Sequence, residues 1–214
     1  MRSAVTASLV SDVTGVLLAG GKSRRMGRDK RVLAVGEQTL LARSLTALRS
    51  VFQHVLVIVA QDTAAIETDA PVLRDVIPDC GSLGGLYTGL KEARTDWVFA
   101  AACDMPFVHS AAIMHFVGLK HEGDVVMAKL RHGLQPMHAL YHRNCLPVME
   151  NLIQARDFKI HRLVDHPSLR VRVVLPEELH LLDPEARSFY NINTPDDLDA
   201  ARVLHENRPK PPTA

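Results

Sequence analysis

The sequence predicts an α/β protein with a Rossmann-like three-layer fold, in which helices cover both faces of a mostly parallel central sheet. Short continuous apolar runs, typical of strands buried on both faces, alternate along the chain with segments of helical periodicity. Glycines or carboxylates directly follow several of these runs, at the sheet edge where ligands bind in open parallel sheets. The 214 residues, 47% of them hydrophobic, suffice for one globular domain with a full core.

The apolar runs and helical repeats can be assigned to elements in chain order. The expected strands are 16–19, 54–60, 72–75, 97–103, 125–130, 137–141 and 171–175, with a short apolar piece at 32–35. Helices are expected over 41–52, 81–93, 110–119, 144–155 and 195–203. Thr39 and Ser110 are the predicted N-caps of the first and third helices, and Pro195 after Thr194 starts the last one. Residues 1–12 are expected to form a loose tail, 13–205 a single domain, and 206–214 a disordered tail.

Composition narrows the range of functions. A net charge of +1 argues against a nucleic-acid-binding protein, which usually carries a basic excess. The three cysteines have no metal-site or disulfide spacing, which favours a reducing compartment and no zinc. The sequence shows neither the apolar core of a signal peptide nor an apolar stretch long enough to span a membrane. We therefore expect a cytoplasmic protein with neither nucleic-acid nor membrane partners.

The stretch Gly15–Lys30, GVLLAGGKSRRMGRDK, indicates a polyphosphate-binding loop. Gly20 and Gly21 end a buried strand and let the backbone approach a ligand closely, because neither has a Cβ. Four cations follow before Asp29, and backbone amides combined with cations suit phosphate groups. A Walker loop is excluded because Val16 stands where its first glycine is needed, and G-x-G-x-x-G is absent. A glycine turn followed by a solvated basic loop is the weaker alternative.

Asp104 is a candidate magnesium ligand. It follows an apolar strand, and Pro106 keeps Met105 extended, so the carboxylate is presented at the sheet edge. Mg²⁺ takes hard oxygen ligands, commonly one or two carboxylates together with substrate phosphates. The alternative is that Asp104 caps the next helix, for which Ser110 is better placed. Asp75 also follows a strand, where a ligand contact and a structural turn are about equally supported.

The stretch LAGGKSRRMGRDK resembles the loop LAGGxSxRMGxDK of the molybdenum cofactor guanylyltransferases, members of the MobA-like nucleotidyltransferase family with a Rossmann-like domain. The resemblance extends from about residue 14 to 203. It implies Mg²⁺-dependent transfer of GMP from GTP to molybdenum-bound molybdopterin, giving the guanine dinucleotide cofactor and pyrophosphate. The implied partners are GTP, molybdopterin, and molybdoenzyme apoproteins with their chaperones.

Three later stretches extend this resemblance. GSLGGLYTGL from Gly81 resembles G-P-L-x-G-x-x-x-G-L, with Ser82 in place of the usual proline, and close helix–sheet packing is an equal explanation of its glycines. QPMHALY from Gln135 resembles Q-P-L-x-A-L-Y, and NINTP from Asn191 resembles N-x-N-T-P. The resemblance thus divides the domain into a nucleotide-binding half, about 13–106, and an acceptor half, about 107–205.

Carried over residue by residue, the resemblance implies three sets of site residues. The catalytic residues are Arg25, Lys30 and Asp104, with Asp104 also the metal ligand. The nucleotide is expected to contact Leu18, Ala19, Gly20, Gly21, Lys30, Asp75, Gly84 and Asp104. The acceptor is expected to contact Gln135, Asn191 and Asn193, with both asparagine side chains on one side of a short strand.

The match departs from the family after the strand 54–60, where an asparagine is usual and this chain offers only Gln61 as a candidate. Two alternative functions stay open. A cytidylyltransferase of the same cofactor, or a sugar- or alcohol-phosphate nucleotidyltransferase, is one, although cytidylyl relatives tend to carry LAAG and Gly21 favours guanine. A non-catalytic nucleotide- or cofactor-binding partner is the other, and the presence of both Lys30 and Asp104 argues against it.

Overall fold

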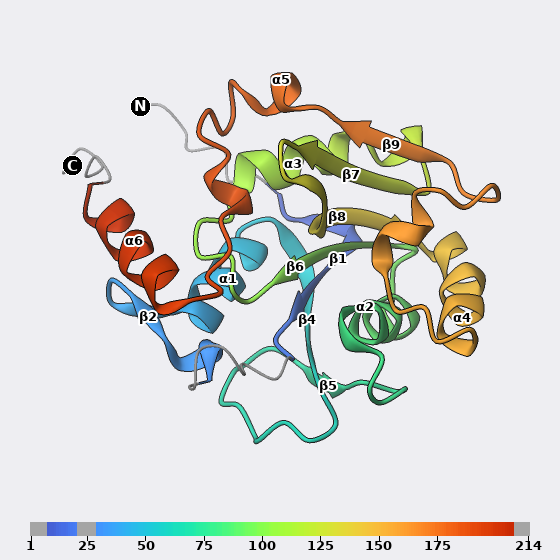
Figure 1. Ribbon diagram of the computed structural model, residues 1–214, viewed down its shortest axis with the longest axis horizontal. Coiled ribbons are helices and arrows are strands. Elements are labelled where there is room, and N and C mark those ends of the chain that lie inside the picture. The colour runs from blue at the N-terminus through green and yellow to red at the C-terminus, as the bar shows by residue number, and fades with distance from the viewer. Residues whose placement is uncertain (1–7, 21–28, 208–214) are drawn as a thin grey trace.

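The computed structural model describes residues 8–20 and 29–207, which form a central sheet with helices on both faces (Figure 1). Gly21 and Arg25 lie outside these residues. The sheet strands are β1 Val10–Leu18, β4 Phe52–Val59, β5 Val72–Arg74, β6 Trp97–Ala102, β7 Val125–Leu130, β8 Gly133–His142 and β9 Val171–Val174. A separate hairpin consists of β2 Ala34–Val35 and β3 Gln38–Thr39.

The strand order is β5-β4-β1-β6-β8-β7-β9. Among these described strands only β8 runs antiparallel, pairing with β6 on one side and β7 on the other. The predicted mostly parallel sheet is therefore confirmed. The chain passes from β1 to β4 and β5 on one side, then crosses to β6 on the other side of β1. This reversal opens a crevice beyond the carboxyl ends of β1 and β6, where open α/β sheets bind their ligands.

The amino-terminal boundary differs from the expected one, because β1 begins at Val10 rather than after a loose tail of twelve residues. The Val10 N–H donates to the carbonyl of Val51 at 2.8 Å, and Val10 pairs with Phe52 of β4. The first three side chains of β1 are partly or fully exposed, so they do not extend the apolar run. Backbone pairing, which leaves no mark in hydrophobic pattern, lengthens the strand.

The long helices agree with the predicted helical repeats, except that Phe52, expected in the first helix, is the first residue of β4. They are α1 Leu40–Arg49, α2 Gly81–Glu92, α3 Ser110–Gly118, α4 Leu146–Gln154 and α6 Pro195–Glu206, with a short α5 at Pro176–Leu179. Thr39 and Thr194 accept capping hydrogen bonds as N-caps of α1 and α6. The expected cap at Ser110 is wrong, since Ser110 is the first helical residue and His109 holds the cap position without a side-chain bond.

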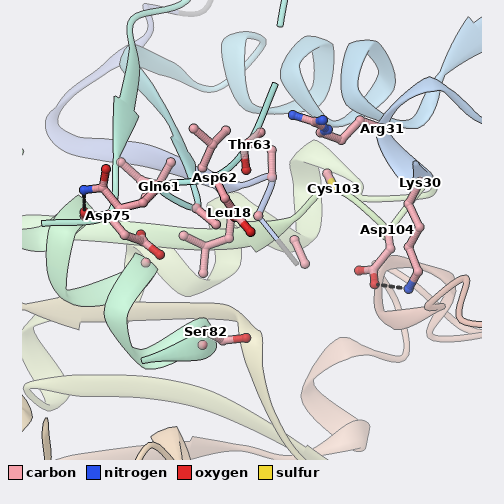
Figure 2. A pocket seen from close by; sticks show the side chains of 18 of the residues that line it. Leu18, Lys30, Arg31, Gln61, Asp62, Thr63, Asp75, Ser82, Cys103 and Asp104 are labelled. Atoms are coloured by element: carbon pink, nitrogen blue, oxygen red, sulfur yellow. Dashed lines mark hydrogen bonds and ion pairs between the residues drawn. The ribbon is translucent and has the colours of Figure 1, made fainter. Parts of the chain in front are cut away.

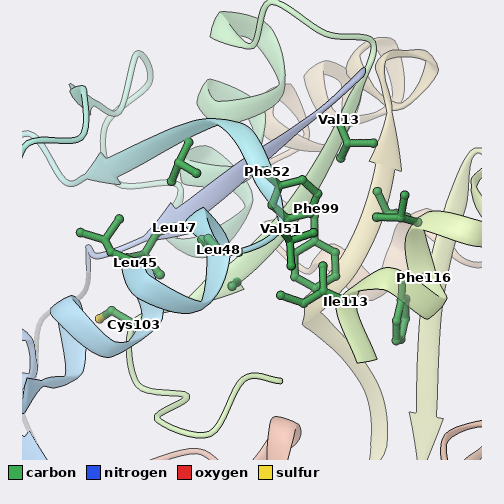
Figure 3. Packing of buried hydrophobic residues seen from close by; sticks show 14 of the residues in the cluster. Val13, Leu17, Leu45, Leu48, Val51, Phe52, Phe99, Cys103, Ile113 and Phe116 are labelled. Atoms are coloured by element: carbon green, nitrogen blue, oxygen red, sulfur yellow. The ribbon is translucent and has the colours of Figure 1, made fainter. Parts of the chain in front are cut away.

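Two hydrophobic layers hold the helices to the sheet. One layer joins α1 and α3 to the sheet through side chains that include Leu48, Phe99 and Phe116 (Figure 3). The other joins α2 and α4 to the opposite face. A smaller cluster packs α6 against the β2–β3 hairpin. Within the described residues, no helix combines the length and apolar character that crossing a bilayer requires.

Candidate active site

A cavity of about 1180 Å³ lies beyond the carboxyl ends of β1, β4, β5 and β6. Its lining comes from several separate stretches of the chain: Leu18, Ala19, Gly20, Asp29, Lys30, Arg31, 58–64, Asp75, Pro78, Asp79, Gly81, Ser82, Gly85, 102–104, Met137 and Asn191. Carboxylates and a lysine follow the strands that converge here, as the strand-end pattern predicted. Figure 2 shows two polar groups at opposite ends of this space, Asp75 with Gln61 at one end and Lys30 with Asp104 at the other.

Lys30 is held between two side chains from distant parts of the chain. Its Nζ donates to Asp104 Oδ2 at 3.0 Å and to Asn193 Oδ1 at 3.0 Å. Asp104 follows β6 in a turn, and Lys30 begins the 3-10 turn Lys30–Val32 that Asp29 caps. Both charged side chains keep about a fifth of their surface exposed, 17% for Lys30 and 21% for Asp104. The ammonium group is thus fixed yet open to an anionic ligand.

The NINTP stretch reaches the same place, although it does not form the expected strand. Residues 191–193 are irregular, and the Ile192 N–H donates to the carbonyl of Asp104 at 2.9 Å. Asp197 accepts the N–H groups of Asn193 and Thr194, at 2.9 and 2.8 Å, which begins α6. The backbone N–H groups of this segment donate to Asp104 and Asp197 rather than to a neighbouring strand. The two asparagine side chains therefore do not share one side of a strand: Asn191 lines the cavity and Asn193 contacts Lys30.

Asp75 places a carboxylate at the other end of the cavity. Only 8% of the residue is exposed, and its Oδ1 has no hydrogen-bond partner among the described residues. Burial without a compensating cation raises the pKa of Asp75 to about 6. Its backbone is fixed from three directions: Asp75 N–H donates to Val59, Gln61 Nε2 donates to the Asp75 carbonyl, and Val76 N–H donates to Thr88 Oγ1. A ligand offering N–H groups would satisfy the buried oxygen.

Glycines bring backbone close to this end of the cavity. A Cβ at Gly20 would lie 2.9 Å from the amide nitrogen of Ala60, and one at Gly85 would lie 3.4 Å from Asp75 Oδ1. Gly84 is not among the described residues that line the cavity, and a Cβ there would meet Cβ of Cys80 at 2.8 Å. Gly85, one residue further along α2, lines the cavity instead, because the helix turns Gly84 toward its own preceding turn. The nucleotide contact expected at Gly84 stays a prediction.

The other predicted site residues fall into three groups. Leu18, Ala19, Gly20, Lys30, Asp75, Asp104 and Asn191 line the cavity. Gln135 is absent from the described lining; it lies at the start of β8, and its amide donates to the carbonyl of Gly133 at 3.0 Å. Arg25 and Gly21 lie outside the described residues. Sequence reasoning left the loop 60–64 without an assigned role, although the polar residues directly after β4 were a usable signal.

Asp104 could contribute one carboxylate to a magnesium site whose other ligands come from outside the described residues. Among the described residues, no cluster of three or more His, Cys, Asp or Glu side chains could hold a metal on its own. Asp104 supplies one carboxylate beside Lys30, and magnesium sites often use one or two carboxylates completed by phosphates and water. The adjacent Cys103 is unsuited as a ligand, because burial raises the pKa of its thiol to about 12.

Comparison with known proteins agrees with this geometry. The family described as "MobA-like NTP transferase domain" matches residues 15–172. A probable molybdenum cofactor guanylyltransferase of Pelotomaculum thermopropionicum is 34% identical over 195 residues, which cover 91% of this chain and 94% of that protein. The molybdenum cofactor guanylyltransferase of Desulfosudis oleivorans is 32% identical over 193 residues, which cover 89% of this chain and 95% of that protein.

A solved structure is also similar over most of the chain. The molybdopterin-guanine dinucleotide biosynthesis protein A of Archaeoglobus fulgidus aligns with a TM-score of 0.80 and 28% sequence identity. The alignment covers 91% of this chain and 100% of that one. The similarity therefore extends over most of this chain.

Proposed function

The chain belongs to the MobA-like NTP transferase family, and on this basis we propose that it is a molybdenum cofactor guanylyltransferase. It transfers GMP from GTP to molybdenum-bound molybdopterin and releases pyrophosphate, which yields the guanine dinucleotide form of the cofactor. The observation that carries the proposal is the cavity with a cationic end at Lys30 and a buried carboxylate at Asp75. A nucleoside triphosphate has the same polarity, with phosphates at one end and a base at the other.

Asp75 supports guanine as the base. Guanine presents two neighbouring donors, N1–H and the N2 amino group, to which one carboxylate can bind through both oxygens. Cytosine presents an amino donor beside an acceptor nitrogen, so a carboxylate would face a repulsive lone pair. The Oδ1 of Asp75, which has no hydrogen-bond partner among the described residues, therefore complements guanine better than cytosine.

Lys30 serves the triphosphate. An oxygen of the acceptor's terminal phosphate attacks the α-phosphorus of GTP in line, and the bond from the α-phosphorus to the α–β bridging oxygen breaks. No general base is needed, because the attacking phosphate is already anionic at neutral pH. The Lys30 ammonium meets the negative charge that builds on pyrophosphate as it leaves. Arg25, outside the described residues, is proposed to assist it.

Asp104 would hold Mg²⁺ together with phosphate oxygens of the nucleotide. When bound, the ion neutralises phosphate charge and polarises the phosphoryl group. The chain itself contributes the orientation: Lys30 bridges Asp104 and Asn193, and the Ile192 N–H fixes the Asp104 carbonyl. Bound phosphates are thereby aligned with a segment of the acceptor half, where Gln135, Asn191 and Asn193 are proposed to meet molybdopterin.

The proposal extends to the setting of the reaction. GTP and molybdopterin are its substrates, and molybdoenzyme apoproteins with their chaperones receive the product. The cytoplasm is the proposed location. Support comes from Cys80, Cys103 and Cys145, all described, which are buried free thiols as expected in a reducing compartment.

Nucleotide turnover tests the proposal. Purified protein is given molybdenum-loaded molybdopterin, Mg²⁺ and either GTP, CTP or ATP, and pyrophosphate release is followed. We expect turnover with GTP well above that with CTP and ATP. Equal turnover with CTP and GTP would refute the guanylyl assignment, whereas cofactor binding without pyrophosphate release would indicate a carrier. Asp104→Asn, which keeps the volume but removes the charge, should reduce turnover by ~100-fold or more.

A further inference from the structure

The loop after β4 forms one wall of the cavity through residues 60–64. We call these five residues the β4 loop. Few backbone hydrogen bonds hold this loop in place. Within the described residues, a single one joins two residues of the loop, from the Thr63 N–H to the Ala60 carbonyl at 3.1 Å. A wall of this kind needs another source of rigidity if it is to present Gln61 and Thr63 at fixed positions to a ligand.

Arg74, at the end of β5, supplies that order. Its Nη1 lies 3.3 Å from the Ala60 carbonyl oxygen, 2.5 Å from that of Gln61 and 3.0 Å from that of Thr63. One guanidinium nitrogen, which carries two N–H groups, therefore lies within hydrogen-bond distance of three carbonyl oxygens of the same short loop. The cation is well suited to this task because its planar group donates in fixed directions and stays charged.

A reciprocal bond ties the same loop to the residue after Arg74. The side-chain amide of Gln61 donates to the carbonyl of Asp75, as Figure 2 shows. Arg74 thus holds the backbone of Gln61, and the Gln61 side chain holds the backbone of Asp75. The two contacts link the β4 loop and the end of β5 to each other in both directions. The Asp75 carboxylate points from this linked region toward the cavity.

We propose that Arg74 is a positioning residue for the nucleotide, acting through the β4 loop and Asp75. Arg74 is exposed and is not among the described residues that line the cavity, so it acts without touching the ligand. The inference rests on the proposed function only in the choice of GTP as ligand. It assigns a role to the part of the chain where the family's usual asparagine is missing.

Three variants test this role. Arg74→Met keeps the aliphatic stem and removes the donors, whereas Arg74→Lys keeps the charge but has a shorter side chain without the planar guanidinium. Arg49→Met is the matched control, because Arg49 pairs with Asp69 further along the same β4–β5 connection and neither residue lines the cavity among the described residues. The readouts are the Kd for GTP, kcat at saturating GTP, and amide hydrogen exchange of residues 60–64 in nucleotide-free protein.

Arg74→Met should raise the Kd for GTP by roughly 5-fold, the size of one ordinary net hydrogen bond, because Arg74 is exposed and acts only through the loop. Exchange of the β4 loop should accelerate, while kcat at saturating GTP stays within about 2-fold because bound nucleotide restores the loop. Arg74→Lys should be intermediate in both Kd and exchange. Arg49→Met should leave the Kd and the exchange of residues 60–64 unchanged.

Wild-type affinity in Arg74→Met would overturn the proposal. So would full affinity in Arg74→Lys with exchange as fast as in Arg74→Met, because charge alone would then account for binding. A weakened Kd without faster exchange would also overturn it, since the loop would not be the intermediary. If the wild type binds another triphosphate in place of GTP, the proposed function fails, and the same comparison made with that nucleotide still decides the role of Arg74.

Discussion

At the scale of single residues, Lys30 joins the two halves of the proposed site. Asp104 and Asn193 both accept from its Nζ, and Asn193 is 163 residues away in the chain. Asn193, assigned by resemblance to the acceptor, is therefore also a partner of the proposed catalytic lysine. Its loss should affect chemistry as well as acceptor binding.

A double-mutant cycle measures this link. Asn193→Ala should lower kcat by roughly 2- to 13-fold, the equivalent of one solvent-exposed hydrogen bond, and Lys30→Ala should lower it further. The double variant should be less impaired than the product of the two effects, with a coupling of about 0.5–1.5 kcal/mol. Asn191→Ala is the control, because its amide donates to the Phe189 carbonyl rather than contacting Lys30. Strictly additive effects of Lys30 and Asn193 would contradict the linkage.

Asp75 should weaken the fold while serving the ligand. Its folded pKa of about 6 exceeds its unfolded value of 3.8, so ionisation above pH 6 destabilises the native state, and this penalty fades as the pH falls toward 3.8. Asp75→Asn should therefore stabilise the nucleotide-free protein at pH 8 by on the order of 2 kcal/mol, with little gain near pH 4. Urea unfolding at both pH values measures this.

The same variant should bind GTP more weakly, because an amide cannot accept both guanine donors at full strength. Asp62→Asn provides the comparison, since Asp62 lines the same cavity but is exposed and should change stability little. A less stable Asp75→Asn protein at pH 8 would contradict the view that the ionised carboxylate is strained by burial.

At the scale of elements, α2 approaches β1 through its glycines. A Cβ at Gly89 would lie 2.6 Å from Val16 Cγ1, whereas one at Gly85 would lie 3.1 Å from the flexible end of Leu18. Helix–sheet packing and ligand access, the two explanations of this glycine pattern, thus apply to different residues: Gly89 packs against the sheet, and Gly85 lines the cavity.

Alanine substitutions should separate these roles. Gly89→Ala should destabilise the protein by about 1–2 kcal/mol, because overpacking against the stiff Val16 exceeds the gain in helix propensity. Gly85→Ala should change stability less but weaken GTP binding, because its methyl group would narrow the cavity beside Asp75. Gly118→Ala in α3 is the control, since no described atom lies within 4 Å of the added Cβ. Thermal unfolding and GTP titration of all three variants measure these effects. If Gly85→Ala and Gly89→Ala changed stability and GTP affinity equally, the assignment of Gly89 to packing and Gly85 to ligand access would be wrong.

At the scale of the whole molecule, one buried histidine should set the acid limit of stability. His138 of β8 is fully buried among Phe99, Phe116 and Phe189, with ring centroids 4.9, 5.3 and 4.6 Å away. Neither ring nitrogen has a hydrogen-bond partner within the described part of the chain. Burial lowers the pKa of His138 to about 3, so the unfolded chain binds the proton first.

The stability due to neutral His138 should be complete above pH 6.5 and fall as the pH drops from 6.5 toward 3. His138→Phe removes the titration and two unpaired nitrogens, so it should gain about 2 kcal/mol relative to wild type on going from pH 7.5 to pH 5. Denaturant unfolding at both pH values measures the difference. His180→Gln, which alters an exposed histidine, should follow wild type. An unchanged acid dependence in His138→Phe would exclude His138 as its source.

The sequence predicted much of this architecture because burial and backbone geometry leave local patterns. Continuous apolar runs marked the parallel strands, and the spacing of Leu41, Leu45 and Leu48 marked α1. The strand-end positions of Asp75 and Asp104 followed from those runs, and both residues line the cavity. The start of β1 at Val10 was missed because exposed residues paired through backbone atoms carry no hydrophobic signal.

By itself, then, the sequence determined the elements, the sheet class and the strand ends that supply polar groups, since each depends on residues near one another in the chain. The tertiary structure alone decided which of those groups meet. Lys30 contacts Asn193 because the C-terminal segment is bonded to Asp104. Gly85 rather than Gly84 lines the cavity because of the rotation of α2. Arg74 contacts the β4 loop because β5 pairs with β4. Such contacts depend on packing between distant segments, which no local periodicity encodes.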